Sequence, residues 1–173
     1  MREGRPEDGV TRRGRILGID PGSRTTGYGI IDKNGSAIGF VACGTIRPNS
    51  GADLNDRLLE IFEGLGRVIE KYRPDVAAIE EMFVARNPRS ALILGHARGV
   101  AVLAAMKGGI SVHGYSPRMV KQAVAGYGQA GKEQVQHMVC ALLELSSSPS
   151  SDAADALAVA ICHANQMVVE PAG

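Results

Sequence analysis

The sequence predicts one α/β domain on a five-stranded mixed sheet, an antiparallel meander followed by parallel crossovers, with helices flanking the sheet. Two observations predict this class. Three short apolar runs come first and are joined by tight turns. From residue 52 onward the apolar residues recur every three or four positions, with two further strand-like runs between these helical segments. We expect residues 15–166 to form the domain, preceded by a disordered lead-in (1–14) and followed by a short tail (167–173).

The first three strands are expected at residues 15–20, 26–33 and 37–46. The first is the run RILGID, which ends in an aspartate before the turn sequence PGS. Between the second and third strands, Asn34 and Gly35 suit the positive φ angles of a hairpin turn. Connections this short join antiparallel strands, so these residues predict a meander.

The rest of the chain alternates helices and strands. Apolar periodicity predicts a helix from Ala52 to Tyr72, with Asp53 as a candidate cap and Arg73-Pro74 as its end. Strands are expected at 76–81 and 111–116. The remaining helices are expected at 89–107, from Pro117 with Ser116 as cap, at 132–145 and at 151–164. Right-handed crossovers back to the first strand would place that strand at the centre of the sheet.

Composition argues against several classes of protein. No apolar run approaches the roughly 18 residues of a membrane span, and the polar N-terminus lacks the apolar core of a secretory signal. Three widely spaced cysteines predict neither a zinc site nor a disulfide framework, and they favour a reducing cytoplasm. The net charge is only +1, so any nucleic-acid surface must gather its basic residues on one face.

Four carboxylates fall where such a fold could bring them together. Asp20 ends the first strand and Glu80 ends the fourth, so neighbouring parallel strands would present both at one sheet edge. Asp152 and Asp155 are three residues apart at the start of a helix, which places them on one face, about 5–6 Å apart. Such a cluster needs a hard cation, and Mg²⁺ prefers carboxylate oxygen. Two such ions could cleave a phosphodiester, so the sequence predicts a metal-dependent nuclease.

Each acid also has an ordinary structural interpretation. Asp20 before Pro-Gly could be a turn residue, and Asp152 could cap its helix. Glu80 needs a partner or a purpose inside its apolar strand, whereas Glu81 alternates to the opposite face and could be a solvated acid. The convergence of all four acids, rather than any one of them, therefore carries the hypothesis.

Four long segments in order resemble the RuvC family of bacterial Holliday-junction resolvases. They are ILGIDPGSRTTGYGII, IEEMFVARNPRSALILGHARG, VKQAVAGYGQAGKEQVQHMV and DAADALAVAICH, and the likeness runs from about Arg15 to His163. The resemblance implies a ribonuclease H-like fold and an endonuclease that resolves four-way DNA junctions by paired hydrolysis in recombination and repair. The polar extension at the N-terminus and the tail VVEPAG depart from the family pattern without touching its motifs.

The resemblance also assigns residues. Asp20, Glu80, Asp152 and Asp155 fall on the family's catalytic, metal-binding acids, where some members have histidine at the position of Asp152. Further positions match DNA contacts: Phe83 an aromatic that stacks on a base, Lys121 and Lys132 basic residues near the scissile phosphate, and Arg86, Arg89 and Arg118 weaker candidates for backbone contacts. Phe83 could equally be a core residue, and each arginine a surface charge.

The cofactors and partners implied are those of the family. We expect Mg²⁺, with Mn²⁺ able to substitute and two ions per site, and no nucleotide cofactor. The expected partners are four-way junction DNA, a second copy of the chain, and the RuvA–RuvB branch-migration complex in a bacterial cytoplasm, with no membrane. Small residues make the helix at 89–107 slim enough for close packing, in the dimer or in the core: Gly95, Ala97, Gly99, Ala101, Ala104 and Ala105.

Other functions remain open at the level of sequence. The first motif alone also fits a YqgF-type nuclease acting on RNA. It fits ATPases and sugar kinases too, but these duplicate the domain and are much longer. The segment GYGQAGKE resembles a Walker A loop, yet Glu133 stands where Ser or Thr is needed and a helix precedes it. A junction-binding module without catalysis is disfavoured because all four acids are present.

Overall fold

The computed structural model describes residues 13–82 and 87–167, and the order of its elements is the order expected from the sequence. The elements are β1 (Arg13–Asp20), β2 (Thr26–Asn34), β3 (Ala37–Ile46), α1 (Leu54–Tyr72), β4 (Val76–Glu80), α2 (Pro88–Lys107), β5 (Ser111–Tyr115), α3 (Pro117–Ala125), α4 (Lys132–Leu142) and α5 (Ser151–Gln166). Several boundaries differ from the prediction by one to three residues, and two of them change the assignment of a segment. β1 begins at Arg13, and α4 ends at Leu142 because Glu144 has a φ of 52°. Residues 13 and 14 therefore belong to β1 and not to the lead-in.

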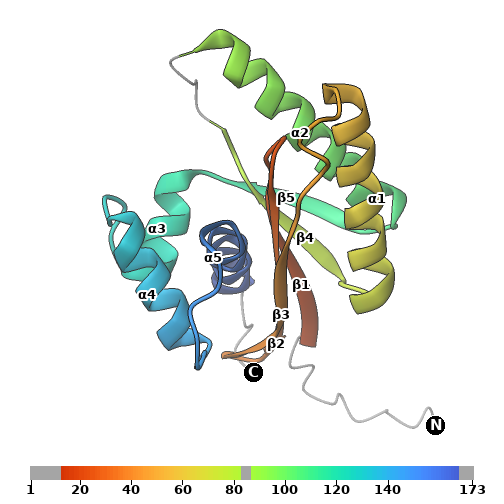
Figure 1. Cartoon of the computed structure of the whole chain (residues 1–173). Coiled ribbons are helices and arrows are strands. Elements are labelled where there is room, and N and C mark those ends of the chain that lie inside the picture. The colour runs from red at the N-terminus through yellow and green to blue at the C-terminus, as the bar shows by residue number, and fades with distance from the viewer. Residues whose placement is uncertain (1–12, 83–86, 168–173) are drawn as a thin grey trace, which may run out of the picture.

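The sheet has the order β3-β2-β1-β4-β5, with β1 at its centre as predicted (Figure 1). β1 pairs antiparallel with β2, and β2 with β3, which makes the expected meander. β4 pairs parallel with β1, and β5 parallel with β4. The carboxyl ends of β1, β4 and β5 therefore lie along the same edge of the sheet, which is called the carboxyl edge below.

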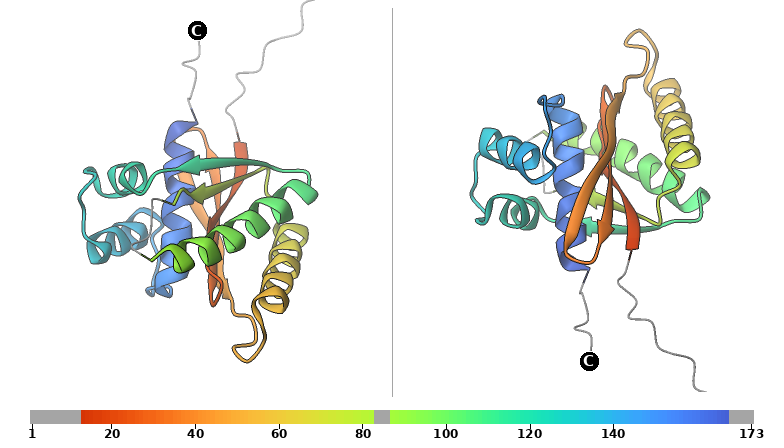
Figure 2. Two further views of the ribbon diagram at one scale, coloured as in Figure 1. Left: turned by 90° about the horizontal axis from the view of Figure 1, so that it is seen from above. Right: turned by 90° about the horizontal axis from the view of Figure 1, so that it is seen from below.

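Helices cover both faces of the sheet (Figures 1 and 2). On one face α5 packs against β1 and β2, and α3 and α4 lie outside α5. On the other face α1 and α2 pack on each other and on the sheet. Each face has its own apolar core: one contains Ile16, Ala78 and much of α5, and the other contains Leu17, Ile79 and the inner side of α1.

Helix α2 buries less of itself than its run of small residues suggests. Its alanines at positions 97, 101, 104 and 105 face the core, whereas an added Cβ would meet nothing within 4 Å at Gly95 or Gly99. Leu92, Leu103 and Met106 are 68%, 62% and 58% exposed. By length and composition alone this helix could cross a membrane, and only 22% of its most apolar stretch is buried. The small residues thus divide between a core face and an open apolar face.

Candidate active site

Asp20 and Glu80 are brought together by strand pairing. Ile19 of β1 is in register with Ile79 of β4, so the next residue of each parallel strand is one of the two acids. Side chains alternate along a strand, and Gly18, two residues before Asp20, faces α5. Ala78, two residues before Glu80, belongs to the same core cluster as α5. Both carboxylates therefore lie at the carboxyl edge on the face covered by α5.

The backbone of α5 lies directly on the strands that carry these acids. A Cβ added at Gly18 would lie 1.9 Å from the carbonyl oxygen of Ala156, and one added at Gly27 would lie 2.0 Å from that of Asp152. Gly27 is also the residue paired with Asp20 across the β1–β2 hairpin. No side chain fits at either position, so glycine is required for the first turns of α5 to reach the carboxyl edge.

Asp152 and Asp155 come from these first turns. Ser150 is the N-cap of α5, and its hydroxyl accepts a hydrogen bond from the backbone N–H of Ala153 at 3.4 Å. The interpretation of Asp152 as a cap is therefore wrong, because Ser150 takes that position and Asp152 lies within the first turn. The helix dipole favours the ionised form of a carboxylate there.

The choice of Glu80 over Glu81 agrees with the geometry. The carboxylate of Glu81 lies on the opposite face, where its Oε1 is 2.6 Å from the position of a Cβ added at Gly114. Tyr115, the β5 partner of Glu80, is buried in the core cluster that contains α5. Glu80 is thus the member of the pair that faces Asp155 and α5.

The acids repel one another in partly buried surroundings. The pKa of Asp20 is raised from 3.8 to about 7, first by burial and then by the charges of Asp155, Asp152 and Glu80. The pKa of Glu80 is also raised, by burial and by Asp155. These couplings place the four carboxylates within one electrostatic site, as expected from the sequence.

Two lysines partly compensate this negative charge. The Nζ of Lys132, the first residue of α4, lies 3.0 Å from Oδ2 of Asp155, and this hydrogen bond raises the pKa of the lysine. Lys121 of α3 and Lys132 both act to lower the pKa of Glu80. Both lysines therefore stand on the α3–α4 side of the acids.

The donor set fits a hard divalent cation. Four carboxylates offer only oxygen ligands, and the pKa values of Asp20 and Glu80 are raised by burial first and by the charges of neighbouring acids second, despite the nearby lysines. Within residues 13–82 and 87–167, however, no three His, Cys, Asp or Glu side chains are already spaced to hold a metal ion. Repelling carboxylates are expected to stay apart until a cation draws them in, so the donor chemistry, rather than the spacing of the side chains, indicates the class of cation.

The comparison with protein families identifies the chain's relatives. The model described as "Crossover junction endodeoxyribonuclease RuvC" matches residues 16–163. The chain belongs to the RuvC family. A family member from Cupriavidus metallidurans is 55% identical over 151 residues, covering 87% of this chain and 83% of the relative. One from Geobacter sulfurreducens is 54% identical over 156 residues, covering 90% of this chain and 95% of the relative. Nucleases of this family are metal-dependent.

Solved structures agree with this membership. Thermus thermophilus RuvC in complex with a Holliday junction substrate matches with a TM-score of 0.81 and 35% identity, covering 87% of this chain and 93% of the other. A yeast mitochondrial Holliday junction resolvase matches with a TM-score of 0.60 at 14% identity, which shows the fold alone. The fold is ribonuclease H-like, as the family resemblance implied.

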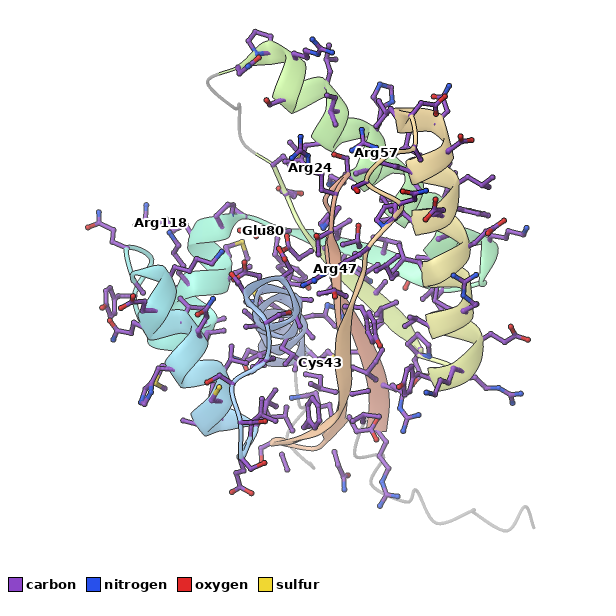
Figure 3. All side chains as sticks on the ribbon, viewed as in Figure 1. Arg24, Cys43, Arg47, Arg57, Glu80 and Arg118 are labelled. Carbon is purple, nitrogen blue, oxygen red and sulfur yellow. The ribbon has the colours of Figure 1, made fainter. Side chains whose placement is uncertain are left out.

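The other DNA-contact candidates are less tightly tied to the acids. Arg118, in the first turn of α3, is exposed, and its Cγ lies 2.5 Å from a Cβ position of Gly128 in the glycine loop before α4. Figure 3 shows Arg118 at the rim on the same side of the molecule as Glu80. Arg89 is exposed at the start of α2, where its backbone N–H donates to the Asn87 side chain. Phe83 and Arg86 lie outside the described residues.

Two groups of residues near the site escape prediction from the sequence. The first is a buried pair: the hydroxyl of Tyr115 lies 2.6 Å from Nδ1 of His163, which joins β5 to α5. On sequence alone His163 has the character of a packing or surface residue, and a tyrosine and a histidine 48 residues apart give no local signal. The second group is Arg24 in the β1–β2 turn, Arg47 directly after β3 and Arg57 in the first turn of α1 (Figure 3). Arg24 and Arg47 lie just outside the predicted strands, which could have identified them, whereas Arg57 lies inside the predicted helix and gives no such signal.

Proposed function

We propose that this chain is a crossover junction endodeoxyribonuclease that resolves four-way DNA junctions by paired phosphodiester hydrolysis in recombination and repair. The observation that carries the proposal is the convergence of Asp20, Glu80, Asp152 and Asp155 at one sheet edge, in a chain that matches the RuvC family over residues 16–163. A shared fold alone would not specify a reaction, because ribonuclease H-like sheets carry several chemistries.

The four acids are proposed as the metal ligands and catalytic residues. The ions proposed are Mg²⁺, two per site, with Mn²⁺ as a substitute, because carboxylate oxygens suit hard cations. Such ions supply an activated water and charge stabilisation at the scissile phosphate. The chain's own part is to hold Asp20 and Glu80 on rigid strand ends and Asp152 and Asp155 on a helix seated against those strands.

Lys132 and Lys121 are proposed to act on the phosphate. In the described structure Lys132 is bound to Asp155, and its side chain is 61% exposed. The ammonium of Lys132, exposed and beside Asp155, would face a phosphate bound over the acids and would stabilise charge that develops on the phosphate oxygens. Lys121, whose charge reaches Glu80, is placed to act on the same group. Phe83 is proposed to stack on a base, and Arg86, Arg89 and Arg118 are proposed to contact the DNA backbone.

The open face of α2 is proposed as the homodimer interface. Leu92, Gly99, Leu103 and Met106 recur at intervals that place them on one helix face, and the exposed fractions of the three apolar side chains are above half. The glycines allow a partner helix to approach closely. A two-fold dimer places one active site on each of two opposed strands of a junction.

This interface can be tested by introducing one charged residue. Leu103→Glu is expected to convert a dimer into a monomer in sedimentation velocity and to leave the melting temperature nearly unchanged. Leu59→Glu on α1, also more than half exposed, is the matched control and should leave the dimer intact. A Leu103→Glu protein that sediments like the wild type would remove α2 from the interface.

The wider context is also proposed from family membership. The chain is expected to act in the cytoplasm of a bacterium on junctions delivered by the RuvA–RuvB branch-migration complex.

The test of the proposed function is a cleavage assay on a synthetic mobile four-way junction. We expect symmetric paired nicks in Mg²⁺ and none in EDTA, with little cleavage of a linear duplex of the same sequence. A structured RNA of equal length tests the alternative YqgF-type activity. RNA cleavage with an uncut junction would overturn the proposal. On a supercoiled cruciform plasmid, linear products support paired action, and an accumulation of singly nicked circles argues against it.

A further inference from the structure

Three arginines line the carboxyl edge on the side of the acids away from α3 and α4. Asp20 is paired with Gly27, and Thr26 is paired with Ile46, so the β1–β2 turn and the first residue after β3 lie just beyond the level of the acids. Arg24 occupies that turn and Arg47 is that first residue. Together with Arg57 they are called the arginine bank below.

Arg57 joins this group from the first turn of α1. The chain passes from the end of β3 to α1 through a short loop at the carboxyl edge, and Ile46 packs against Gly64 of α1. In the view of Figure 3, Arg24 and Arg57 are labelled toward the top of the sheet and Arg47 lower down, while Arg118 lies on the other side of Glu80. Basic side chains therefore stand on both sides of the acids.

No arginine of the bank is paired with a carboxylate within 4 Å in the described structure. Among the described residues the ion pairs are Arg15 with Asp32 and Lys132 with Asp155, and none involves the bank. The acids of the adjoining segment are engaged elsewhere: Asp53 accepts from the backbone N–H of Asp56, and Glu60 from that of Asn49.

One member of the bank also has an unmet hydrogen-bond donor. The Nε of Arg57 is buried and has no hydrogen-bond partner among the described residues. The same is true of Arg98, on the helix that packs against α1. A buried donor without an acceptor costs free energy, and a charged one costs more. No group of the described chain therefore satisfies this donor, and the Arg57 guanidinium has no ion-pair partner there.

We propose that the arginine bank binds the phosphodiester backbone of the DNA on the side of the cleavage site opposite Lys121 and Lys132. The DNA strand to be cut then crosses the four acids, with the arginines binding it on one side and the lysines on the other. These contacts fix the path of the strand over the site. This inference rests on the proposed function, since it assigns a second contact region to the same substrate. Arginine suits the role because its planar guanidinium binds phosphate with two parallel hydrogen bonds.

The experiment measures how junction binding depends on salt. Asp20→Asn serves as the background, so that DNA is bound without being cut, and affinity is followed by fluorescence anisotropy of a labelled four-way junction between about 50 and 200 mM NaCl. In this background Arg24, Arg47 and Arg57 are changed to Gln. The slope of log K against log salt should become shallower by about 0.9 for every phosphate that the bank neutralises in the parent protein.

A charge-matched control removes three cations elsewhere. Arg13, Arg67 and Lys71 are exposed, at the start of β1 and in the later part of α1, away from the carboxyl edge. Changing these three to Gln should leave the slope at the value of the background protein. A general effect of net charge would lower both slopes equally, and that result would overturn the inference.

Folding and the proposed function are controlled separately. Arg57 is partly buried, so the double change of the exposed Arg24 and Arg47 to Gln replaces the triple variant if the latter melts early. A slope unchanged in a folded bank variant refutes the bank while leaving the enzyme assignment intact. An Asp20→Asn protein that binds the junction no better than linear duplex refutes the proposed function, and the bank inference falls with it.

Discussion

The Nζ of Lys132 lies 3.0 Å from Oδ2 of Asp155, and this contact joins the first residue of α4 to the helix that carries two of the four acids. It is an ion pair between an exposed lysine and a partly buried aspartate, and exposed pairs contribute only about 0–1 kcal/mol to stability. This contact therefore matters for chemistry rather than for stability, because it holds the ammonium of Lys132 beside the carboxylates proposed to bind metal.

Removing Lys132 should slow cutting without unfolding the protein. Lys132→Gln is expected to lower the rate of junction cleavage on the order of 10²-fold, since one charge that stabilises the phosphate is removed. Lys132→Arg should retain most of the rate, and Lys107→Gln at the far end of α2 should have no effect. Single-turnover cleavage and thermal melting give the two readouts. A variant that cuts at the wild-type rate would make Lys132 a surface charge.

The two neighbouring glutamates should differ sharply. Glu80→Gln removes a ligand from the face that carries the other acids, so cleavage in Mg²⁺ should fall by at least about 10³-fold while junction binding persists. Glu81→Gln changes an exposed side chain on the opposite face and should leave cleavage within about twofold. The pair is measured in parallel on the same junction. Equal losses in both variants would contradict the assignment of Glu80.

Asp20→Asn should stabilise the metal-free protein at neutral and alkaline pH. The folded pKa of Asp20 is raised from 3.8 to about 7, so the native state binds more protons than the unfolded state between these values. Stability is therefore lost as pH rises through this window, and the full cost is present above about pH 7. The amide avoids that cost.

The measurement is melting in EDTA at several pH values. The melting temperature of Asp20→Asn should exceed that of the wild type at pH 8, by about 2–4 °C per kcal/mol for a domain of this size, and the difference should vanish near pH 4. Added Mg²⁺ should raise the melting temperature of the wild type more than that of the variant. A wild type that is the more stable form in EDTA at pH 8 would contradict the prediction.

The buried Tyr115–His163 pair should make stability depend on pH in the opposite direction. Burial, with the charge of His113 in addition, lowers the pKa of His163 from 6.5 to about 4. The unfolded state then takes up a proton below about pH 6.5 that the native state refuses until about pH 4. The stability contributed by neutral His163 is thus present at pH 7 and is lost as pH falls through this window.

His163→Gln isolates this effect from other titrating groups. The free energy of unfolding of the wild type should exceed that of the variant at pH 7, and this advantage should shrink steadily toward pH 4 in urea titrations. Tyr115→Phe, which leaves the ring nitrogen of His163 without its partner, should cost about 1–3 kcal/mol at pH 7. An advantage of wild type over His163→Gln that is constant from pH 7 to pH 4 would contradict this account.

The fold could be predicted from sequence because its signals are local. The hairpin at Asn34-Gly35, the caps Asp53 and Ser116 and the change from strand to helix periodicity each specify their own segment, and Asp53 and Ser116 accept the expected backbone hydrogen bonds. The positions of Asp20 and Glu80 at strand ends followed from the same local signals. Parallel pairing of β1 with β4 then placed the two acids side by side.

What could not be predicted depends on which surfaces meet. Apolar residues are spread nearly evenly around α2, so its sequence does not show which face is buried. The division into a core face and an open face depends on which side of α2 is covered by α1. The same holds for Tyr115 and His163, and for the arginine bank, whose members come from three separate elements. The capping of α5 by Ser150 rather than Asp152 shows how a run of serines leaves two equally good local choices.

Gly18 and Gly27 let the backbone of α5 lie directly on β1 and β2. The position of Asp152 and Asp155 relative to Asp20 therefore depends on these two close contacts as well as on the apolar packing of α5 against the sheet. A single methyl group at either glycine would lift both helix-borne acids together. Such a change would damage catalysis out of proportion to its size, so these two glycines are the positions where tolerance to mutation should be lowest outside the acids themselves.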